Sequence, residues 1–91
     1  MAKKRRRAKK GALRVWWIPQ VPGEAFHVRV KSVEQAKFTI TLLADYDQFQ
    51  LDQRVKGDYS NAGGLQMWDG EEWTEWYSED GEDIDEVMEA A

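Results

Sequence analysis

Residues 63–77, GGLQMWDGEEWTEWY, constrain the fold of this chain most, because they hold three of its five tryptophans. Apolar and polar residues alternate from Leu65 to Trp68, which is the period of a half-buried strand. Asp69 and Gly70 then supply turn chemistry, since both tolerate the positive φ angles of tight turns. A second aromatic run follows, so the stretch predicts a β-hairpin.

The length of the turn decides which residues face each other. A two-residue loop of Asp69 and Gly70 would place acids opposite apolar residues. A four-residue loop over 69–72 instead places Trp68 opposite Trp73, and cross-strand aromatic pairs are worth roughly 0.2–1 kcal/mol over an alanine pair. We therefore expect the four-residue loop. One face then holds Leu65, Met67, Thr74 and Trp76, and the other holds Gln66, Trp68, Trp73 and Glu75.

Two strands are expected before the hairpin. Along Leu13–Ile18 the odd-numbered residues face one side, and Pro19 ends the strand because proline cannot donate to a ladder. Residues 26–31 alternate between a dry face and a wet, basic face, and His27 on the wet face is expected to be a surface residue. The expected inward set of the whole sheet is Leu13, Val15, Trp17, Phe26, Val28, Val30, Leu65, Met67 and Trp76.

A helical segment separates the two pairs of strands. Ser32 is the predicted N-cap, in a capping box with Gln35. Asp45 could begin a second short helix over 46–54, and the sequence leaves open whether the two segments join. The apolar residues at helical spacing predict a buried stripe of Val33, Ala36, Ile40, Leu43 and Ala44, widened by Phe38 and Leu42.

These elements predict a two-layer α+β domain of order ββααββ. Two antiparallel β-hairpins form one sheet, and the helical segment lies on one face. Near the end of the chain, Asp83 and Glu86 make a D-x-x-E helix start. A helix that short cannot hold alone in water, so we expect it to be frayed or docked on a partner.

Charge divides the 91-residue chain into three parts. Residues 1–10 carry seven Lys/Arg and no acid, residues 11–68 carry six of each sign, and residues 69–91 carry eleven acids and no base. Dense blocks of like charge repel themselves and tend to be disordered. We therefore expect a disordered basic arm over 1–12, a single domain over 13–78 and an acidic tail over 79–91.

The composition argues against catalysis. The chain has no cysteine, which excludes disulfides and thiolate chemistry, and it has one histidine. It shows no Gly-rich phosphate loop and no Ser/His/Asp set, and a domain this small has little volume for a catalytic pocket. No stretch approaches the roughly 20 apolar residues of a membrane span. We expect an intracellular protein that is not an enzyme and uses no cofactor or metal.

Two groups of residues are candidates for binding a protein partner. Large aromatics left on a surface usually mark interfaces, and Trp16, Trp68 and Trp73 are expected to form an exposed patch. The loop over 57–64 delivers polar residues to the hairpin, where binding residues often lie. Those side chains equally suit a structural role, in which they bond to neighbouring backbone and shape the loop. They are Asp58, Tyr59, Ser60 and Asn61.

The two charged ends allow other functions. The basic arm could contact several phosphates, so it predicts non-specific, salt-dependent binding of nucleic acid. Residues 69–91 could instead mimic nucleic acid, or the two ends could attract each other and give weak self-association. The cations of the arm are Lys3, Lys4, Arg5, Arg6, Arg7, Lys9 and Lys10.

Four segments carry a resemblance to a known family: VWWIPQVPGEAFHV at 15–28, LLADYDQFQ at 42–50, DYSNAGGL at 58–65 and WTEWYSEDG at 73–81. They resemble small proteins of tailed bacteriophages, of the superinfection-exclusion type first described among phages of enteric bacteria. The resemblance covers about residues 13–81, and the basic arm departs from the compact start expected of the family. It implies a phage protein in the bacterial cytoplasm that alters the host's response to another phage. It implies no cofactor, catalytic residue or mechanism, and we expect a non-enzymatic protein that binds a host or phage protein.

Overall fold

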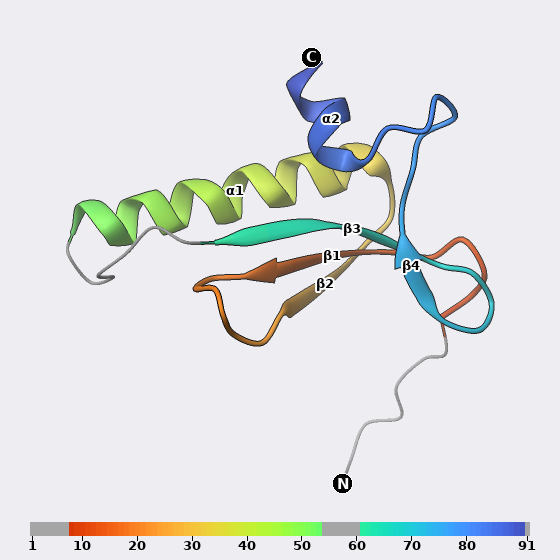
Figure 1. Cartoon of the computed structure of the whole chain (residues 1–91), viewed down its shortest axis with the longest axis horizontal. Coiled ribbons are helices and arrows are strands. Elements are labelled where there is room, and N and C mark those ends of the chain that lie inside the picture. The colour runs from red at the N-terminus through yellow and green to blue at the C-terminus, as the bar shows by residue number, and fades with distance from the viewer. Residues whose placement is uncertain (1–7, 54–60, 91) are drawn as a thin grey trace, which may run out of the picture.

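The computed structural model describes residues 8–53 and 61–90. The four strands form one antiparallel sheet in the order β2-β1-β3-β4, and α1 covers one face of it (Figure 1). The predicted α+β class, with two hairpins in one sheet and a helical face, is confirmed. The elements are β1 (Leu13–Ile18), β2 (Phe26–Val30), α1 (Val33–Asp52), β3 (Ala62–Trp68), β4 (Trp73–Glu75) and α2 (Ile84–Glu89).

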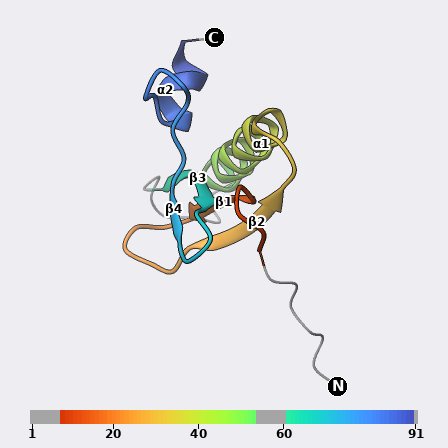
Figure 2. The same ribbon diagram turned by 90° about the vertical axis from the view of Figure 1, so that its right-hand side faces the viewer.

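The core lies between the inner face of the sheet and the two helices, which are on the same side of the sheet (Figure 2). Val15 is on β1, which lies between β2 and β3, and it pairs with Val28 on β2 and Leu65 on β3. Alternation in β1 thus gives the buried face that the sequence predicts. The buried apolar residues are Val15, Trp17, Val30, Ala36, Ile40, Leu65 and Ile84.

Phe26 departs from the predicted inward set. Its side chain is 56% exposed, although it has the same parity along β2 as the buried Val30. Phe26 begins an edge strand and lines a pocket beside α1, so nothing covers its outer side. The prediction of a buried Phe26 is wrong for that reason.

The β3–β4 hairpin has the predicted four-residue loop. Trp68 pairs with Trp73, and the Asp69 amide donates to the Glu72 carbonyl at 3.0 Å. The Asp69 carboxylate accepts from the backbone amides of Glu71 and Glu72 at 2.7 and 2.8 Å. Those amides are the largest reason why the pKa of Asp69 is lowered. The turn is therefore closed by its own first residue.

β3 begins at Ala62, so the last residues of the predicted 57–64 loop belong to the sheet. Gly63 and Gly64 lie opposite Trp17 and Trp16 on β1. A Cβ atom on Gly64 would lie 2.5 Å from the Trp16 indole nitrogen, and one on Gly63 would collide with the Trp17 ring. Glycine at these positions gives both indoles the space in which they pack.

α1 is one helix of 20 residues, which joins the two predicted helical segments. The Ser32 hydroxyl caps it by accepting from the Gln35 amide at 3.0 Å. The Gln35 side chain accepts from the Lys31 amide at 2.5 Å, so the predicted capping box is only half formed. Asp45 is an exposed residue inside the helix and not a cap, and residue 54 lies outside the described ranges.

α2 is docked on the chain's own core. Asp83 caps it in a reciprocal capping box with Glu86, and Ile84 is 1% exposed. Met88 packs against the same core cluster. Residues 79–91 were expected to form an acidic tail whose short helix is frayed or docked on a partner, but Ile84 supplies enough apolar contact to hold this helix on the body.

The sheet also continues slightly beyond β1 toward the N-terminus. The Gly11 amide donates to the Trp68 carbonyl and the Trp68 amide to the Ala12 carbonyl, both at 2.8 Å. These bonds extend the pairing of β1 with β3, so the last two residues of the predicted arm are held by the sheet.

Candidate functional site

The face of the sheet opposite α1 brings the three predicted tryptophans together, and we call it the outer sheet face. Strand alternation and the pairing register place all its residues on one side. The Trp68 and Trp73 rings meet edge to face with centroids 5.5 Å apart and planes inclined by 62°. The face holds Arg14, Trp16, His27, Arg29, Gln66, Trp68, Trp73 and Glu75.

The tryptophans of the outer sheet face are half-buried, which corrects the expected exposed patch. Two arginines reach over Trp73: the guanidinium carbon of Arg14 lies 4.3 Å from the ring centroid and that of Arg29 lies 5.4 Å away. Arg14 also donates from Nε to the Gln66 side-chain oxygen at 2.8 Å. Burial, and then the charge of Arg29, lowers the pKa of Arg14. The two guanidinium groups thus cover part of the Trp73 ring that would otherwise be apolar surface open to a partner.

Trp16 and Glu75 lie toward the β4 side of the same face. The Trp16 indole nitrogen is buried and has no hydrogen-bond partner, and the Glu75 carboxylate lies near it without hydrogen-bond geometry. Burial is the largest cause that raises the pKa of Glu75, and the charges of Asp83 and Asp85 add to it. His27 is exposed as predicted, and burial and Arg14 lower its pKa.

A buried polar link on the other side of the sheet was not found from the sequence. Asp47 on α1 is 2% exposed, and its Oδ2 accepts from the Trp17 indole nitrogen at 3.1 Å and from the Asn61 amide nitrogen at 2.9 Å. Asn61 was a predicted binding residue, and its side chain bonds the Asp47 carboxylate on α1 rather than the neighbouring backbone of its loop. One signal was available: Asp47 falls seven residues after Ile40, on the buried stripe.

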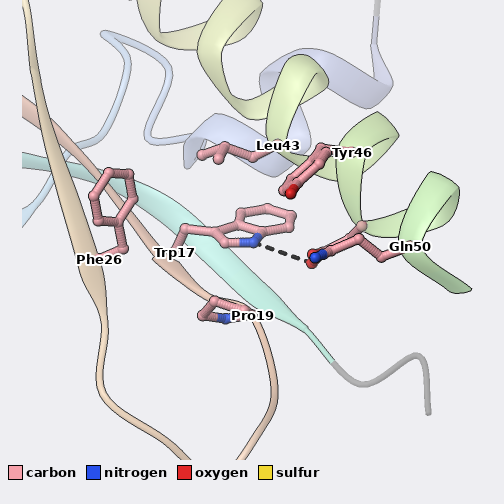
Figure 3. Close-up of a pocket in the computed structure, with 7 residues that line it drawn as sticks. Trp17, Pro19, Phe26, Leu43, Tyr46 and Gln50 are labelled. Atoms are coloured by element: carbon pink, nitrogen blue, oxygen red, sulfur yellow. Dashed lines mark hydrogen bonds between the residues drawn. The ribbon is translucent and has the colours of Figure 1, made fainter. Parts of the chain in front are cut away.

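A pocket of about 270 Å³ opens beside this link, between α1 and the start of β2. Figure 3 shows the Trp17 ring at its centre, with Leu43 and Tyr46 from α1 on one side and Pro19 on the other. The dashed line in the figure is the Trp17–Asp47 hydrogen bond. The lining is mainly apolar and consists of Trp17, Pro19, Phe26, Leu43, Tyr46, Asp47 and Gln50.

The most exposed large apolar side chains of the described residues include four on α1, which we call the α1 outer stripe. They are Phe38, Leu42, Tyr46 and Phe49, with 71%, 56%, 57% and 57% of their surface exposed. Their spacing of four, four and three residues puts them on one side of the helix. The expectation that Phe38 and Leu42 widen the buried stripe is wrong. Small Ala36, fully buried, forms the close contact with the sheet instead.

Other predicted site residues lie outside the described ranges or stand apart from these surfaces. Lys9 and Lys10 are exposed, and Lys10 is one of the charges that lower the pKa of Asp69. No group of three or more His, Cys, Asp or Glu among the described residues could hold a metal ion. Outside the described ranges lie Lys3, Lys4, Arg5, Arg6, Arg7, Asp58, Tyr59 and Ser60.

The fold and these surfaces define a small α+β protein that presents aromatic and apolar side chains on its surface. Neither described helix is long and apolar enough to cross a membrane. The sequence model of the family described as superinfection exclusion gene product 17 matches residues 12–91. A superinfection exclusion protein of Salmonella phage P22 is 48% identical over 80 residues, which cover 74% of this chain and 78% of that protein.

This chain therefore belongs to the superinfection exclusion gene product 17 family, and the bacteriophage family resemblance is confirmed. No solved structure matches it.

Proposed function

We propose that this protein acts in superinfection exclusion as a non-catalytic binding protein that engages a host or phage protein in the cytoplasm of the infected cell. Its family, and the name of its phage P22 relative, support the role in exclusion. The observation that carries the binding mechanism is the α1 outer stripe.

The size of the stripe supports a binding role. An aromatic side chain presents about 150–250 Å², so three rings and a leucine that are each more than half exposed offer on the order of 400 Å² of apolar surface. Contiguous apolar patches of a few hundred Å² on a monomer often mark interaction sites. The stripe also adjoins the pocket, because Tyr46 belongs to both.

The outer sheet face is the second candidate surface for the same function. Trp16, Trp68 and Trp73 lie together there, but they are half-buried. Arg14 and Arg29 lie over Trp73, so a partner would have to displace charged groups to reach its ring. The α1 outer stripe needs no such displacement, which is why we favour it.

An exclusion assay with the full chain tests the proposal. Host cells that express the chain are challenged with a phage that it excludes, and the efficiency of plating is measured. The double variant Leu42→Glu, Phe49→Glu should restore plating, because it puts charge into the stripe at two exposed positions. Tyr77→Ser is the matched control, since Tyr77 is an equally exposed aromatic off the helix.

The outcome separates the two surfaces. Restored plating with Trp68→Ala, Trp73→Ala and not with the stripe variant would move the binding site to the outer sheet face. Exclusion by both double variants at the wild-type level, with folding verified by circular dichroism, would contradict binding through either surface.

Non-specific nucleic-acid binding is a second candidate function, favoured by one observation. Arg14 and Arg29 beside Trp73 combine cations with an aromatic ring on an open sheet face, and such platforms suit single strands. The basic arm would add further phosphate contacts. Fluorescence anisotropy with a labelled oligonucleotide, over a salt series, tests it. Equal affinity of the full chain and of a variant that lacks residues 1–10 would exclude a role for the arm.

A further inference from the structure

We infer that the partner presents a basic amphipathic helix, which packs its apolar side on the α1 outer stripe and aligns Lys or Arg side chains along one border of that stripe. This inference rests on the proposed function, because it names the kind of partner that the same surface takes. The charges along α1 carry the argument.

One border of the stripe is acidic. Glu34, Asp45 and Asp52 are separated by eleven and seven residues, which are about three and about two turns of an α-helix, so they lie in one row. All three are exposed, and they form what we call the acidic border. Lys37 pairs with Glu34 at 3.2 Å, which leaves the two aspartates as the main charges of the row.

Among the residues of α1 that the structure describes, no charged side chain lies on the other border of the stripe. Thr39 and Gln50 fall on that side by the same helical geometry. The last turn of α1 also has no basic residue, so the partial negative charge of the helix C-terminus adds to the field of Asp52. Along Val33–Asp52, a partner therefore meets negative charge on one side of the stripe and uncharged surface on the other.

The pocket lies on the neutral side. Tyr46 and Gln50 form part of its wall. The pocket has a volume of about 270 Å³ and a mainly apolar lining, so it can take a large side chain. Binding energy at interfaces concentrates where such an anchor fills a desolvated pocket. The surface thus has three parallel parts: acidic border, apolar stripe and pocket.

A second copy of this chain fits the surface less well. In an antiparallel two-fold pair of α1 helices, the same flank of each copy lies on the same side of the interface. The acidic borders would then face each other, and Asp45 would approach its own symmetry mate. An anionic lipid surface has the same disadvantage, because it would repel both aspartates.

The probe is a synthetic amphipathic peptide of about five helical turns. It has a leucine stripe and Lys on its polar face, and a matched peptide has Glu in place of Lys. Binding to the full chain is measured by fluorescence anisotropy at about 0.05 M salt, where surface charges are weakly screened. We expect the Lys peptide to bind at least about tenfold more tightly, with a difference that shrinks as salt rises.

Two variants and a control assign the preference to this surface. Asp45→Lys, Asp52→Lys should reverse the order of the two peptides, and Leu42→Glu should weaken both. The control Glu79→Lys, Asp80→Lys makes the same change in net charge at exposed positions off α1 and should leave the order unchanged.

Equal affinity for both peptides, no binding of either, or the same order of affinities after Asp45→Lys, Asp52→Lys would overturn the inference. A dimer in light scattering that Leu42→Glu dissociates would overturn it as well, because a second copy would then be the occupant. If Asp45→Lys, Asp52→Lys still excludes phage while Leu42→Glu, Phe49→Glu does not, the proposed function stands and this inference fails. If the peptides behave as expected but all variants exclude, the proposed function fails instead.

Discussion

The Trp17 indole nitrogen donates to the buried carboxylate of Asp47 over 3.1 Å, and this bond joins β1, one of the two inner strands of the sheet, to α1. The same carboxylate oxygen accepts from Asn61 at 2.9 Å, just before β3 begins. One acidic side chain therefore ties the helix to two strands through polar contacts inside an apolar core. Buried polar groups are costly when they lose their partners, so this link makes a direct prediction.

Asp47→Ala should lower the free energy of unfolding by about 2–4 kcal/mol, because the buried Trp17 donor and the half-buried Asn61 donor lose an acceptor. Asp47→Asn keeps one side-chain oxygen and should cost less. Urea unfolding followed by circular dichroism measures both. Asp45→Ala, an exposed aspartate on the same helix, is the control and should change stability by no more than about 0.5 kcal/mol. Equal losses for the two alanine variants would contradict the role of the buried link.

Gly64→Ala should lower the free energy of unfolding by about 1–3 kcal/mol, since the added methyl group would lie 2.5 Å from the Trp16 indole nitrogen. The double-mutant cycle with Trp16→Ala identifies the cause. In the Trp16→Ala background the same glycine substitution should cost clearly less, because the ring that it meets is gone. Equal costs in both backgrounds would mean that backbone conformation, and not the indole, requires this glycine.

Ile84→Ala should lower the free energy of unfolding by about 2–5 kcal/mol, the range for truncating a buried isoleucine. Chemical denaturation gives the value, and hydrogen exchange of the α2 amides shows whether that helix detaches first. Val87→Ala removes a half-buried side chain from the same helix and serves as the control. If the two substitutions cost the same, α2 is not held on the body through Ile84.

Glu75→Gln should raise stability at neutral pH and leave it unchanged in acid. The raised pKa means that the folded chain keeps a proton on Glu75 that the unfolded chain has released above its ordinary value of 4.5. Stability therefore falls as pH rises through that interval, and the charged carboxylate opposes folding above it. Melting temperatures from pH 4 to 7 should differ between wild type and variant only at the upper end of the range.

Glu79→Gln removes the same charge from an exposed position and is the control for the pH series. An identical gain for this variant would assign the effect to overall net charge rather than to the surroundings of Glu75.

The strands and their register could be predicted because local chemistry and burial agree there. The alternation of side chains along Leu13–Ile18 determines which side of β1 is buried. Cross-strand pairing of Trp68 with Trp73 favours the longer loop, and the Asp69 carboxylate then closes it. These preferences depend on residues that are close together in the sequence, so they can be predicted without knowledge of the tertiary structure.

The predicted buried stripe of α1 is confirmed at Ala36 and Ile40, but its predicted widening by Phe38 and Leu42 is wrong, because the helix is apolar on two sides. The stripe through Phe38 and Leu42 has the same helical spacing as the one through Ala36 and Ile40. Burial of the larger side chains would remove more apolar area from water. The helix nevertheless packs on the sheet with the side that holds the small Ala36, because the helix can approach the sheet closely there. Only the packed structure shows that the stripe through Phe38 and Leu42 stays exposed.

The candidate site was predictable in part. The sequence placed Trp16, Trp68 and Trp73 on one face, and their arrangement follows from the register. The cover over Trp73 comes from arginines of β1 and β2, which meet its ring only after the sheet has formed. Side-chain cover of this kind comes from residues far apart in the sequence.

The burial of Ile84 has a consequence for the synthesis of this protein. The sheet and α1 are complete in sequence before Asp83, but their core lacks one of its fully buried side chains until residues beyond Asp83 have been added. A nascent chain on the ribosome therefore passes through a stage in which Leu65 and Val15 have an incomplete covering. The core of this protein is therefore complete only after the residues of α2 have been synthesised and Ile84 has packed on the sheet.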